Sequence, residues 1–245
     1  MTHAASSHPL ALHLAPTGTL RASINTGNPI LATLDAASGK PAGVSIDLAH
    51  ELGKRLGLPV ELVVFDKGAK SVEAVRGGQA DIGFFAIDPA RSEGLHFTAA
   101  YVLIEGSYLV PAGSTLMENA DVDRVGTRVG VGSGSAYDLF LTRELKAAQI
   151  ARVLHAEEVV RALQAGRIDV AAGIRKQLAT LAQADTALRL LPGRFMVIQQ
   201  AMGMPAGRGT DAEAFLSAFV DEMKASGFVA EALARHGVDG ASVAP

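Results

Sequence analysis

Several residue types that commonly carry chemistry are missing or scarce in this chain. Its 245 residues include no cysteine, no tryptophan and three tyrosines. The absence of cysteine excludes a disulfide framework, a thiol nucleophile and a thiolate zinc site. Few aromatic platforms are left for stacking nucleic-acid bases. Basic and acidic residues are interspersed at a net charge of −3, so no nucleic-acid partner is expected.

Long apolar runs are also lacking. No run approaches the ~20 residues that a bilayer-spanning helix needs. The N-terminal stretch MTHAASSHPLALHLAPTG has neither a basic start nor a continuous apolar core, so it lacks the pattern of a secretory signal. We interpret residues 1–16 as a flexible tail. Either a signal has been removed or the protein stays inside the cell, and the sequence leaves both open.

What the chain does contain is an alternation of short apolar strands and amphipathic helices. Hydrophobic residues make up 49% of the chain and charged residues 19%, which predicts a well-filled core. Glu73–Ile82 is echoed by Arg161–Val170, each being a helix end, a glycine stop, an Asp and an apolar strand. Two α/β lobes built on one plan would produce this echo. Because glycine is favoured in most helix-to-strand loops, the echo is weak evidence of duplication.

Two helices have recognisable starts and stops. Ser45 is expected to cap a helix in which apolar residues recur every four positions and which stops at Gly57. Asp211 is expected to cap a second helix, which stops at Gly227. Short polar side chains commonly cap helix N-termini, and glycine commonly ends helices.

The stretch Gly78–Val110 has the pattern of a ligand site. A buried strand, Ile82–Ile87, ends at a turn that carries Arg91, and a second apolar run, Tyr101–Val110, follows. Ligands of open α/β sheets bind at the carboxyl ends of the strands. A guanidinium group can hold a carboxylate there with two parallel hydrogen bonds. On spacing alone, an ordinary surface arginine would be the favoured interpretation.

A glycine–serine turn marks a second candidate region, Arg128–Leu145. A strand over Arg128–Val131 enters this turn, and a helix follows with Ser135 at its N-cap. Backbone N–H groups at a helix start attract anions. The glycine spacing differs from the dinucleotide fingerprint, and no Gly-Lys-Ser/Thr of a P-loop occurs. No cofactor and no metal ion are expected.

Three motifs resemble those of the bacterial extracellular solute-binding proteins of family 3, the amino-acid-binding components of ABC importers. In that family a strand ends in a Thr-x-x-Arg turn, and a Phe-Ser-x-x-Tyr segment follows. Asp88–Arg91 and Phe97–Tyr101 stand in those places, with Asp88 replacing the usual Thr. Gly43–Leu48 matches the family's Gly-x-x-x-Asp-Leu helix.

The resemblance extends from about Gly18 to Gly237 and implies an α/β, type II periplasmic-binding-protein fold. This fold has two α/β lobes, a hinge and an interlobe cleft. Lobe 1 is expected over residues 17–110 and 203–245, and lobe 2 over residues 111–202. The chain would cross between lobes near Val110–Gly113 and Gln199–Met204, which would form the hinge. A monomer, a periplasmic location and an ABC permease as partner are also implied.

For the binding site, the resemblance implies that Arg91 holds a ligand carboxylate. The backbones of Phe84 and Ala86 would lie beside it. Ser135 and the Ala136 amide would donate to the carboxylate from the second lobe. Asn28, in the turn after the first strand, is a further expected ligand-binding residue.

The expected site departs from the family pattern in two ways. The acid that pairs with a ligand's α-ammonium group lies just past the strand beginning at Asp169, but this chain has Ile174–Lys176 there. The aromatic residues that sandwich the ligand are replaced by Gly27, Ile30 and Gly68. Burying an ammonium group without an anion is costly, so the ligand need not be an α-amino acid.

Two basic residues are candidates for binding a second anionic group. Arg175 stands where the acid is expected, and Lys70 would assist. The alternative is that Arg175 and Lys176 form a solvated helix start, and the sequence favours neither interpretation.

We therefore expect a solute-binding protein, not an enzyme. It would capture a small carboxylate-bearing ligand, an amino acid or a related organic acid, for ABC-type uptake. One alternative is an enzyme that resembles the cyclohexadienyl dehydratases, which needs an acid or base in its cleft. Glu105 and His96 are the titratable residues nearest in sequence to the key stretch. Another alternative is the sensor domain of a larger receptor.

Overall fold

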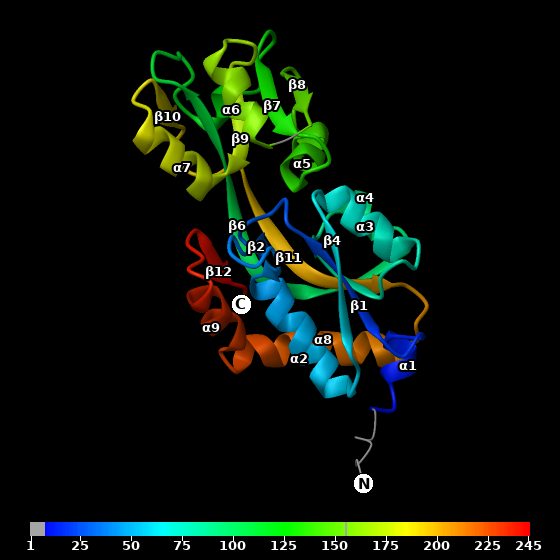
Figure 1. The fold of residues 1–245 in the computed structure, drawn as a ribbon. Helices are drawn as coiled ribbons and strands as arrows, with labels where there is room; N and C mark the ends of the chain where they lie inside the picture. Colours follow the sequence, from blue (N-terminus) through cyan, green and yellow to red (C-terminus); the bar gives the residue numbers. More distant parts are fainter. Residues whose placement is uncertain (1–7, 155) are drawn as a thin grey trace. The chain divides into compact units, whose positions relative to one another are not determined.

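The computed structural model describes residues 8–154 and 156–245. The chain forms two compact units, one of Met1–Val102 with Gln199–Pro245 and the other of Leu103–Ile198. Two long strands, β6 (Leu95–Pro111) and β11 (Met196–Pro205), are shared by the two units (Figure 1). Because both crossings lie inside continuous strands, no loop marks a boundary there. The boundaries expected at residues 110/111 and 202/203 stay a prediction.

Unit 1 is built on a sheet with the strand order β4-β1-β5-β11. The first three strands are parallel, and β11 pairs antiparallel with β5. Its elements, besides the shared strands, are α1 (Ala11–Leu14), β1 (Leu20–Asn25), β2 (Thr33–Leu34), β3 (Pro41–Ala42), α2 (Val44–Leu56), β4 (Val60–Phe65), α3 (Gly68–Arg76), β5 (Ile82–Ala86), α4 (Pro89–Ser92), α8 (Thr210–Ala225), α9 (Phe228–Arg235) and β12 (Ala241–Val243).

Unit 2 repeats the same plan with the strand order β8-β7-β9-β6. Here too three parallel strands are followed by an antiparallel fourth, which is β6. Its other elements are the 3₁₀ helix η1 (Asn119–Asp121), β7 (Arg128–Gly132), α5 (Ala136–Glu144), β8 (Gln149–Val153), α6 (Ala156–Gln164), β9 (Val170–Ile174), α7 (Arg175–Ala184) and β10 (Leu188–Leu190).

Side chains along β5 alternate between the two faces of the unit 1 sheet, and helix α3 covers one of these faces. Phe85 packs with Val72 and Val75 of α3. Phe84 points to the other face and meets the ring of Tyr101 edge-on, with centroids 6.2 Å apart. Successive strand residues point to opposite faces, so a fully buried strand is apolar at every position. All five residues of β5 are buried.

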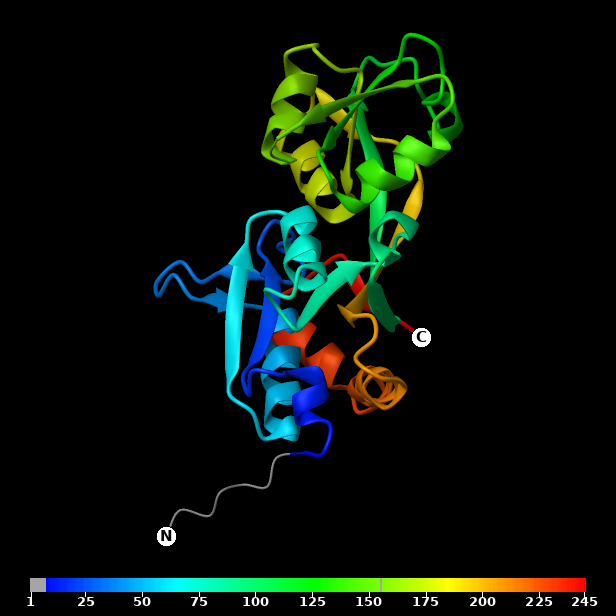
Figure 2. The ribbon, with the colours of Figure 1, turned by 90° about the vertical axis from the view of Figure 1, so that its right-hand side faces the viewer.

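Helices α2, α8 and α9 lie together in unit 1 (Figures 1 and 2). Ion pairs link them: Arg55 of α2 donates to Glu222 of α8 at 2.5 and 2.8 Å, and Arg235 of α9 donates to Asp47 of α2 at 2.7 Å. None of the helices in the described residues is both long and apolar enough to span a bilayer.

The echo seen in the sequence has a structural counterpart in both units. Asp81 precedes β5, and its carboxylate accepts from the backbone and guanidinium of Arg21 at 2.7–3.0 Å. Asp169 precedes β9 and binds Arg128 in the same way at 2.8–2.9 Å. In each unit the aspartate therefore links the start of one parallel strand to the neighbouring parallel strand, β5 to β1 in unit 1 and β9 to β7 in unit 2. The arginine partners were not singled out from the sequence.

The expectation of a flexible tail over residues 1–16 is wrong where the structure describes it. Residues 1–7 lie outside the described residues, but Leu14 and Ala15 are buried at 1% and 0% exposure. The His8 backbone N–H donates to Leu56 O at 3.0 Å, and the His8 ring packs on Phe215. Two buried apolar side chains explain why this segment packs against the unit.

Two predicted helix caps are also wrong. Helix α2 begins two residues earlier than expected, with Gly43 at the N-cap, and Ser45 is buried inside its first turn. Helix α8 begins at Thr210 after Gly209, so Asp211 lies in the first turn. In both cases a glycine takes the cap position, and no side-chain cap hydrogen bond forms.

Candidate functional site

The turn after β5 folds Arg91 back onto the strand that precedes it. Asp88 caps helix α4 by accepting from the Ala90 N–H at 2.9 Å, and Pro89 holds the first helical position. Both features favour a helix start directly after the strand. Arg91 is 7% exposed, and its Nη1 donates to the Ala86 carbonyl oxygen at 3.4 Å. The predicted contact between Arg91 and the Ala86 backbone is therefore present.

The Arg91 guanidinium is a buried cation next to a buried acid. Burial lowers the pKa of Arg91, and the charge of Asp88 acts in the opposite direction. Asp88 is 4% exposed. Burying a cation costs its hydration, and the nearby charge of Asp88 offsets part of that cost.

Two further elements of unit 1 approach the guanidinium. A side chain placed on Gly68, the first residue of α3, would have its Cβ 3.5 Å from Arg91 Nη2 and 3.4 Å from Asn25 Nδ2. Asn25 ends β1, and its Oδ1 accepts from the Gly27 N–H at 3.0 Å. The end of β1 and the start of α3 thus meet at the guanidinium. Because position 68 is glycine, it contributes no side chain over Arg91. Sequence reasoning missed Asn25.

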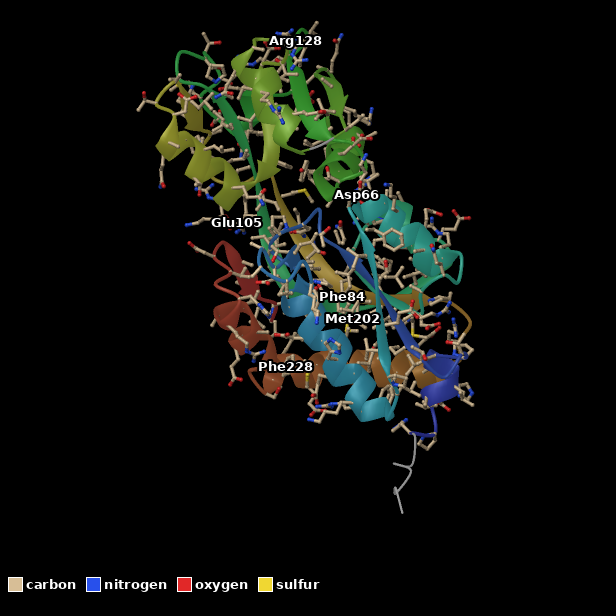
Figure 3. All side chains as sticks on the ribbon, in the orientation of Figure 1. Asp66, Phe84, Glu105, Arg128, Met202 and Phe228 are labelled. Atoms are coloured by element: carbon tan, nitrogen blue, oxygen red, sulfur yellow. The ribbon has the colours of Figure 1, made fainter. Side chains whose placement is uncertain are left out.

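The other residues expected in unit 1 have local roles in the structure. Phe84 is buried, and it pairs with Met202 across β5 and β11 (Figure 3). The Asn28 Oδ1 accepts from the Ile30 N–H at 3.2 Å and so shapes its own turn. Lys70 forms an exposed ion pair with Asp66 at 2.8 Å, which lowers the pKa of Asp66. The structure therefore joins Ala86, but not Lys70, to Arg91.

In unit 2, Ser135 caps α5 as the sequence predicts. Its Oγ accepts from the Asp138 N–H at 3.1 Å. Burial raises the pKa of Tyr137, and a hydrogen bond with Ser135 partly offsets this effect. The Ala136 N–H is the first of the helix. Ser135 and Ala136 are thus both at the helix start, where backbone N–H groups point outward.

A carboxylate of the chain itself already occupies part of this helix start. Asp138 is 4% exposed, and its Oδ2 accepts from the Gly134 N–H at 2.8 Å. Arg152 of β8 donates to its Oδ1 at 3.0 Å. The glycine–serine turn is therefore held by an ion pair between α5 and β8. The sequence pointed to the helix cap at Ser135, but no local signal pointed to Arg152.

Arg175 is engaged within unit 2. Its Nη1 donates to Ser107 Oγ at 3.3 Å and to the Gly193 carbonyl oxygen, and its Nε lies 3.6 Å from Glu105 Oε2. Glu105, labelled in Figure 3, also accepts from Arg194 at 2.5 Å. These contacts join the start of α7 to β6 and to the loop before β11. Arg175 is thus neither a bare helix start nor free of partners.

No group of three or more histidine, aspartate or glutamate side chains in residues 8–154 and 156–245 is arranged to hold a metal ion.

Comparison with known proteins gives one family and many similar structures. The family model of the bacterial extracellular solute-binding proteins, family 3, matches residues 20–238. The solute receptor for L-cysteine of Neisseria gonorrhoeae has a TM-score of 0.76 and 23% identity, over 94% of this chain and 93% of that chain. An amino acid ABC transporter substrate-binding protein of Streptococcus pneumoniae, bound to L-arginine, has a TM-score of 0.75 and 17% identity, over 91% and 96%.

A third similar structure comes from an enzyme lineage. It is an ancestral amino-acid-binding protein, a precursor of cyclohexadienyl dehydratase, with a TM-score of 0.73 and 20% identity, over 92% of this chain and 98% of that chain. At these identities the similar structures show the fold alone. They confirm the type II periplasmic-binding-protein fold that the motifs predict.

Proposed function

Because the chain belongs to the bacterial extracellular solute-binding proteins of family 3, we propose that it captures a small carboxylate-bearing ligand for ABC-type uptake. The ligand is an amino acid or a related organic acid. An ABC permease is the proposed partner, the binding protein acts as a monomer, and its location is periplasmic. Proteins of this family are mainly non-enzymatic binders.

The Arg91 guanidinium is the observation that carries the proposal. It is buried at the carboxyl end of β5, where ligands of α/β sheets bind, and Ala86 O holds it in place. Gly68 leaves the neighbouring position without a side chain. A fixed guanidinium is suited to a carboxylate because both are planar and can share two hydrogen bonds.

Unit 2 supplies the proposed second set of donors. The Ser135 hydroxyl and the Ala136 N–H lie at the start of α5, whose dipole favours an anion. Arg152 and Asp138 hold the turn in which they lie. The expected cleft between the lobes stays a prediction, as do the proposed ligand contacts of Arg175, Lys70, Asn28 and Phe84.

The ligand class follows from what surrounds these donors. Arg175 occupies the place where the family resemblance implies an acid, and it pairs with Glu105. Glu105 is the acid at that place, and two arginines already bind it, so it is poorly suited to pair with a ligand's ammonium group. This favours an organic acid whose second polar group is neutral over a classical α-amino acid, although similar structures include an L-arginine complex.

The test begins with a thermal-shift screen of amino acids, hydroxy acids and dicarboxylates. A ligand at 100 times its dissociation constant adds ~2.7 kcal/mol to the free energy of unfolding. Calorimetry on the hit then compares the protein with Arg91→Met. We expect the substitution to weaken binding by at least about 100-fold, because removing a buried charged partner costs ~2–5 kcal/mol.

Arg235→Met is the matched control. It also removes one arginine from unit 1, but Arg235 is 54% exposed and pairs with Asp47 at the surface. Its ligand affinity should equal that of the unchanged protein. Equal affinity in Arg91→Met, with circular dichroism showing a folded protein, would reject the proposed role of Arg91.

Neither residue named for the enzyme alternative is poised for catalysis. Glu105 is bound by Arg175 and Arg194. His96 lies with its Nδ1 3.6 Å from Glu213, and its Nε2 is enclosed without a hydrogen bond. These arrangements give the enzyme alternative no specific support. Turnover of prephenate or arogenate, followed spectroscopically, would nevertheless overturn the binding proposal.

A further inference from the structure

Gln200 of β11 is a buried polar side chain without a described partner. It is 4% exposed, and its amide forms no hydrogen bond with any residue in the described part of the chain. Burying an amide without a hydrogen bond is unfavourable, so such groups in folded proteins call for an explanation. The fully enclosed polar atoms without a partner among the described residues are His96 Nε2 and Asn119 Oδ1. The Gln200 amide is not one of them, so it retains contact with solvent.

Gln200 is the strand partner of Ala86, the residue whose carbonyl oxygen accepts from Arg91. Gln200 lies directly opposite Ala86 in the antiparallel pair of β11 and β5. The adjacent pair is hydrogen-bonded, because the Ile87 N–H donates to Gln199 O at 2.8 Å. The Gln200–Ala86 pair is therefore the non-hydrogen-bonded kind, in which opposed side chains come closest and share one face.

Ala86 links the two polar groups. Its carbonyl oxygen accepts from Arg91 at 3.4 Å, and its side chain neighbours that of Gln200 on the same face. Phe84 and Met202, the next pair on that face, are apolar and buried (Figure 3). Ala86 is therefore the single residue between the Gln200 side chain and the buried guanidinium, and Gln200, Ala86 and Arg91 all belong to unit 1.

We infer that Gln200 is a ligand-contacting residue that recognises a neutral polar group of the ligand next to its carboxylate. This inference rests on the proposed function and narrows its ligand class. A carboxamide presents one acceptor and two donors and carries no charge. It therefore suits a hydroxyl or carboxamide group, which also donates and accepts, and it does not provide the anion that an ammonium group needs. The chain selects hydroxy acids or amide-bearing acids over the same acids without that group.

The experiment uses pairs of acids that differ in one group. L-malate is compared with succinate, lactate with propionate, and succinamate with butyrate, by calorimetry on the full chain. The protein is expected to bind the hydroxyl- or amide-bearing member of at least one pair tenfold or more tightly. In Gln200→Met, which keeps the length of the side chain, that preference should disappear while the affinity for the bare acid remains.

The neighbouring glutamine provides a matched control. Gln199 is exposed and points to the other face of the strand, so Gln199→Met should keep the preference. Arg91→Met should weaken binding of both members of a pair, which separates the loss of the carboxylate site from the loss of discrimination. Equal binding of the two members in every pair that binds would overturn the inference and leave the proposed function intact. If neither these acids nor any amino acid, hydroxy acid or dicarboxylate of the thermal-shift screen binds, both fail.

A second readout does not depend on any ligand. Replacing an unpaired buried amide with an apolar side chain of similar size removes an unfavourable burial. The thermal unfolding midpoint of ligand-free Gln200→Met should therefore rise above that of the unchanged protein. A lower midpoint would show that the Gln200 amide has a structural hydrogen bond, and the inference would be wrong.

Discussion

At the scale of single residues, the carboxylate of Asp81 shows how burial decides the importance of an ion pair. Its side chain is 0% exposed and accepts from Arg21, with Arg208 3.4 Å away. The equivalent Asp169 in unit 2 is 39% exposed and pairs with Arg128. The two junctions have the same chemistry at different depths. Comparing the Asp81–Arg21 pair with the Asp169–Arg128 pair therefore compares a buried ion pair with an exposed one.

We predict that Asp81→Asn is far more damaging than Asp169→Asn. Asparagine at position 81 would leave Arg21 and Arg208 without their buried anion, which costs about 3 kcal/mol of unfolding free energy. At position 169 water screens the pair, so the loss should be a small fraction of that. Urea unfolding followed by circular dichroism measures both. Equal losses in the two variants would contradict this account.

Sequence reasoning reached some of these residues and missed others for a physical reason. Asp81 and Asp169 were found because glycine and aspartate before an apolar strand are close together in the chain. Their arginine partners are 60 and 41 residues away, so no local pattern connects them. The same holds for Arg152, which is 14 residues from Asp138. Ala86 was placed beside Arg91 by the family resemblance, and the hydrogen bond between the two residues spans only five positions of the chain.

At the scale of elements, the loop after β1 and the loop after β4 pack closely. A Cβ on Gly27 would lie 2.3 Å from the carbonyl oxygen of Asp66. Real Cβ atoms do not come that close, so the backbone would have to move. A Cβ on Gly68 would meet Arg91 and Asn25 at ordinary contact distances of 3.5 and 3.4 Å. The two positions where the resemblance implies aromatic residues are therefore glycine for different structural reasons: position 27 has no room for a side chain, and position 68 has.

These causes lead to opposite predictions for two alanine substitutions. Gly27→Ala should lower the free energy of unfolding by about 1–3 kcal/mol, as overpacking does. Gly68→Ala should fold normally but place a methyl group beside Arg91, so ligand affinity should fall about tenfold, or ~1.4 kcal/mol. Thermal melts and calorimetry separate the two effects. A Gly68→Ala protein with unchanged affinity would show that this face of Arg91 is not used by the ligand.

The elements themselves were largely predictable, but their ends were not. Strand β5 and helix α2 are present where apolar periodicity indicated them, and Gly57 ends α2 in the left-handed conformation. The starts of α2 and α8 were misplaced because serine and aspartate suit the first turn of a helix as well as its cap. Helix α1 was missed because its few apolar residues carry no period, and only packing against the unit makes it a helix.

At the scale of the whole molecule, the strand order 2-1-3 with an antiparallel fourth strand appears in both units. The sequence echo predicted this repetition because it falls at the same junction in each unit. The exchange of β6 and β11 between the units was expected only from the family resemblance. Such a crossing pairs residues that are far apart in the chain, and composition and periodicity carry no information about that.

The three tyrosines of the chain report on both units. Tyr101 belongs to unit 1, and Tyr108 and Tyr137 belong to unit 2. Their exposures are 0%, 2% and 9%. Burial raises the pKa of all three; Asp123 adds to the effect at Tyr108, and hydrogen bonds with Ser45 and Ser135 oppose it at the other two. Since tryptophan is absent, tyrosinate absorbance can be followed without interference.

These pKa shifts predict an alkaline unfolding in which tyrosinate appears only as structure is lost. The folded pKa of each tyrosine lies above its ordinary value near 10, so its contribution to stability is complete below pH ~10 and falls as pH rises toward the folded value. The slope is about 1.4 kcal/mol per pH unit for each tyrosine. Absorbance and circular dichroism should therefore change together, whereas protein unfolded in guanidinium should titrate near pH ~10.

Tyr101→Phe should remove one third of the final tyrosinate absorbance, because Tyr101 is one of three tyrosines. A tyrosinate signal near pH ~10 with a native circular dichroism spectrum would mean that at least one ring is accessible in the folded protein.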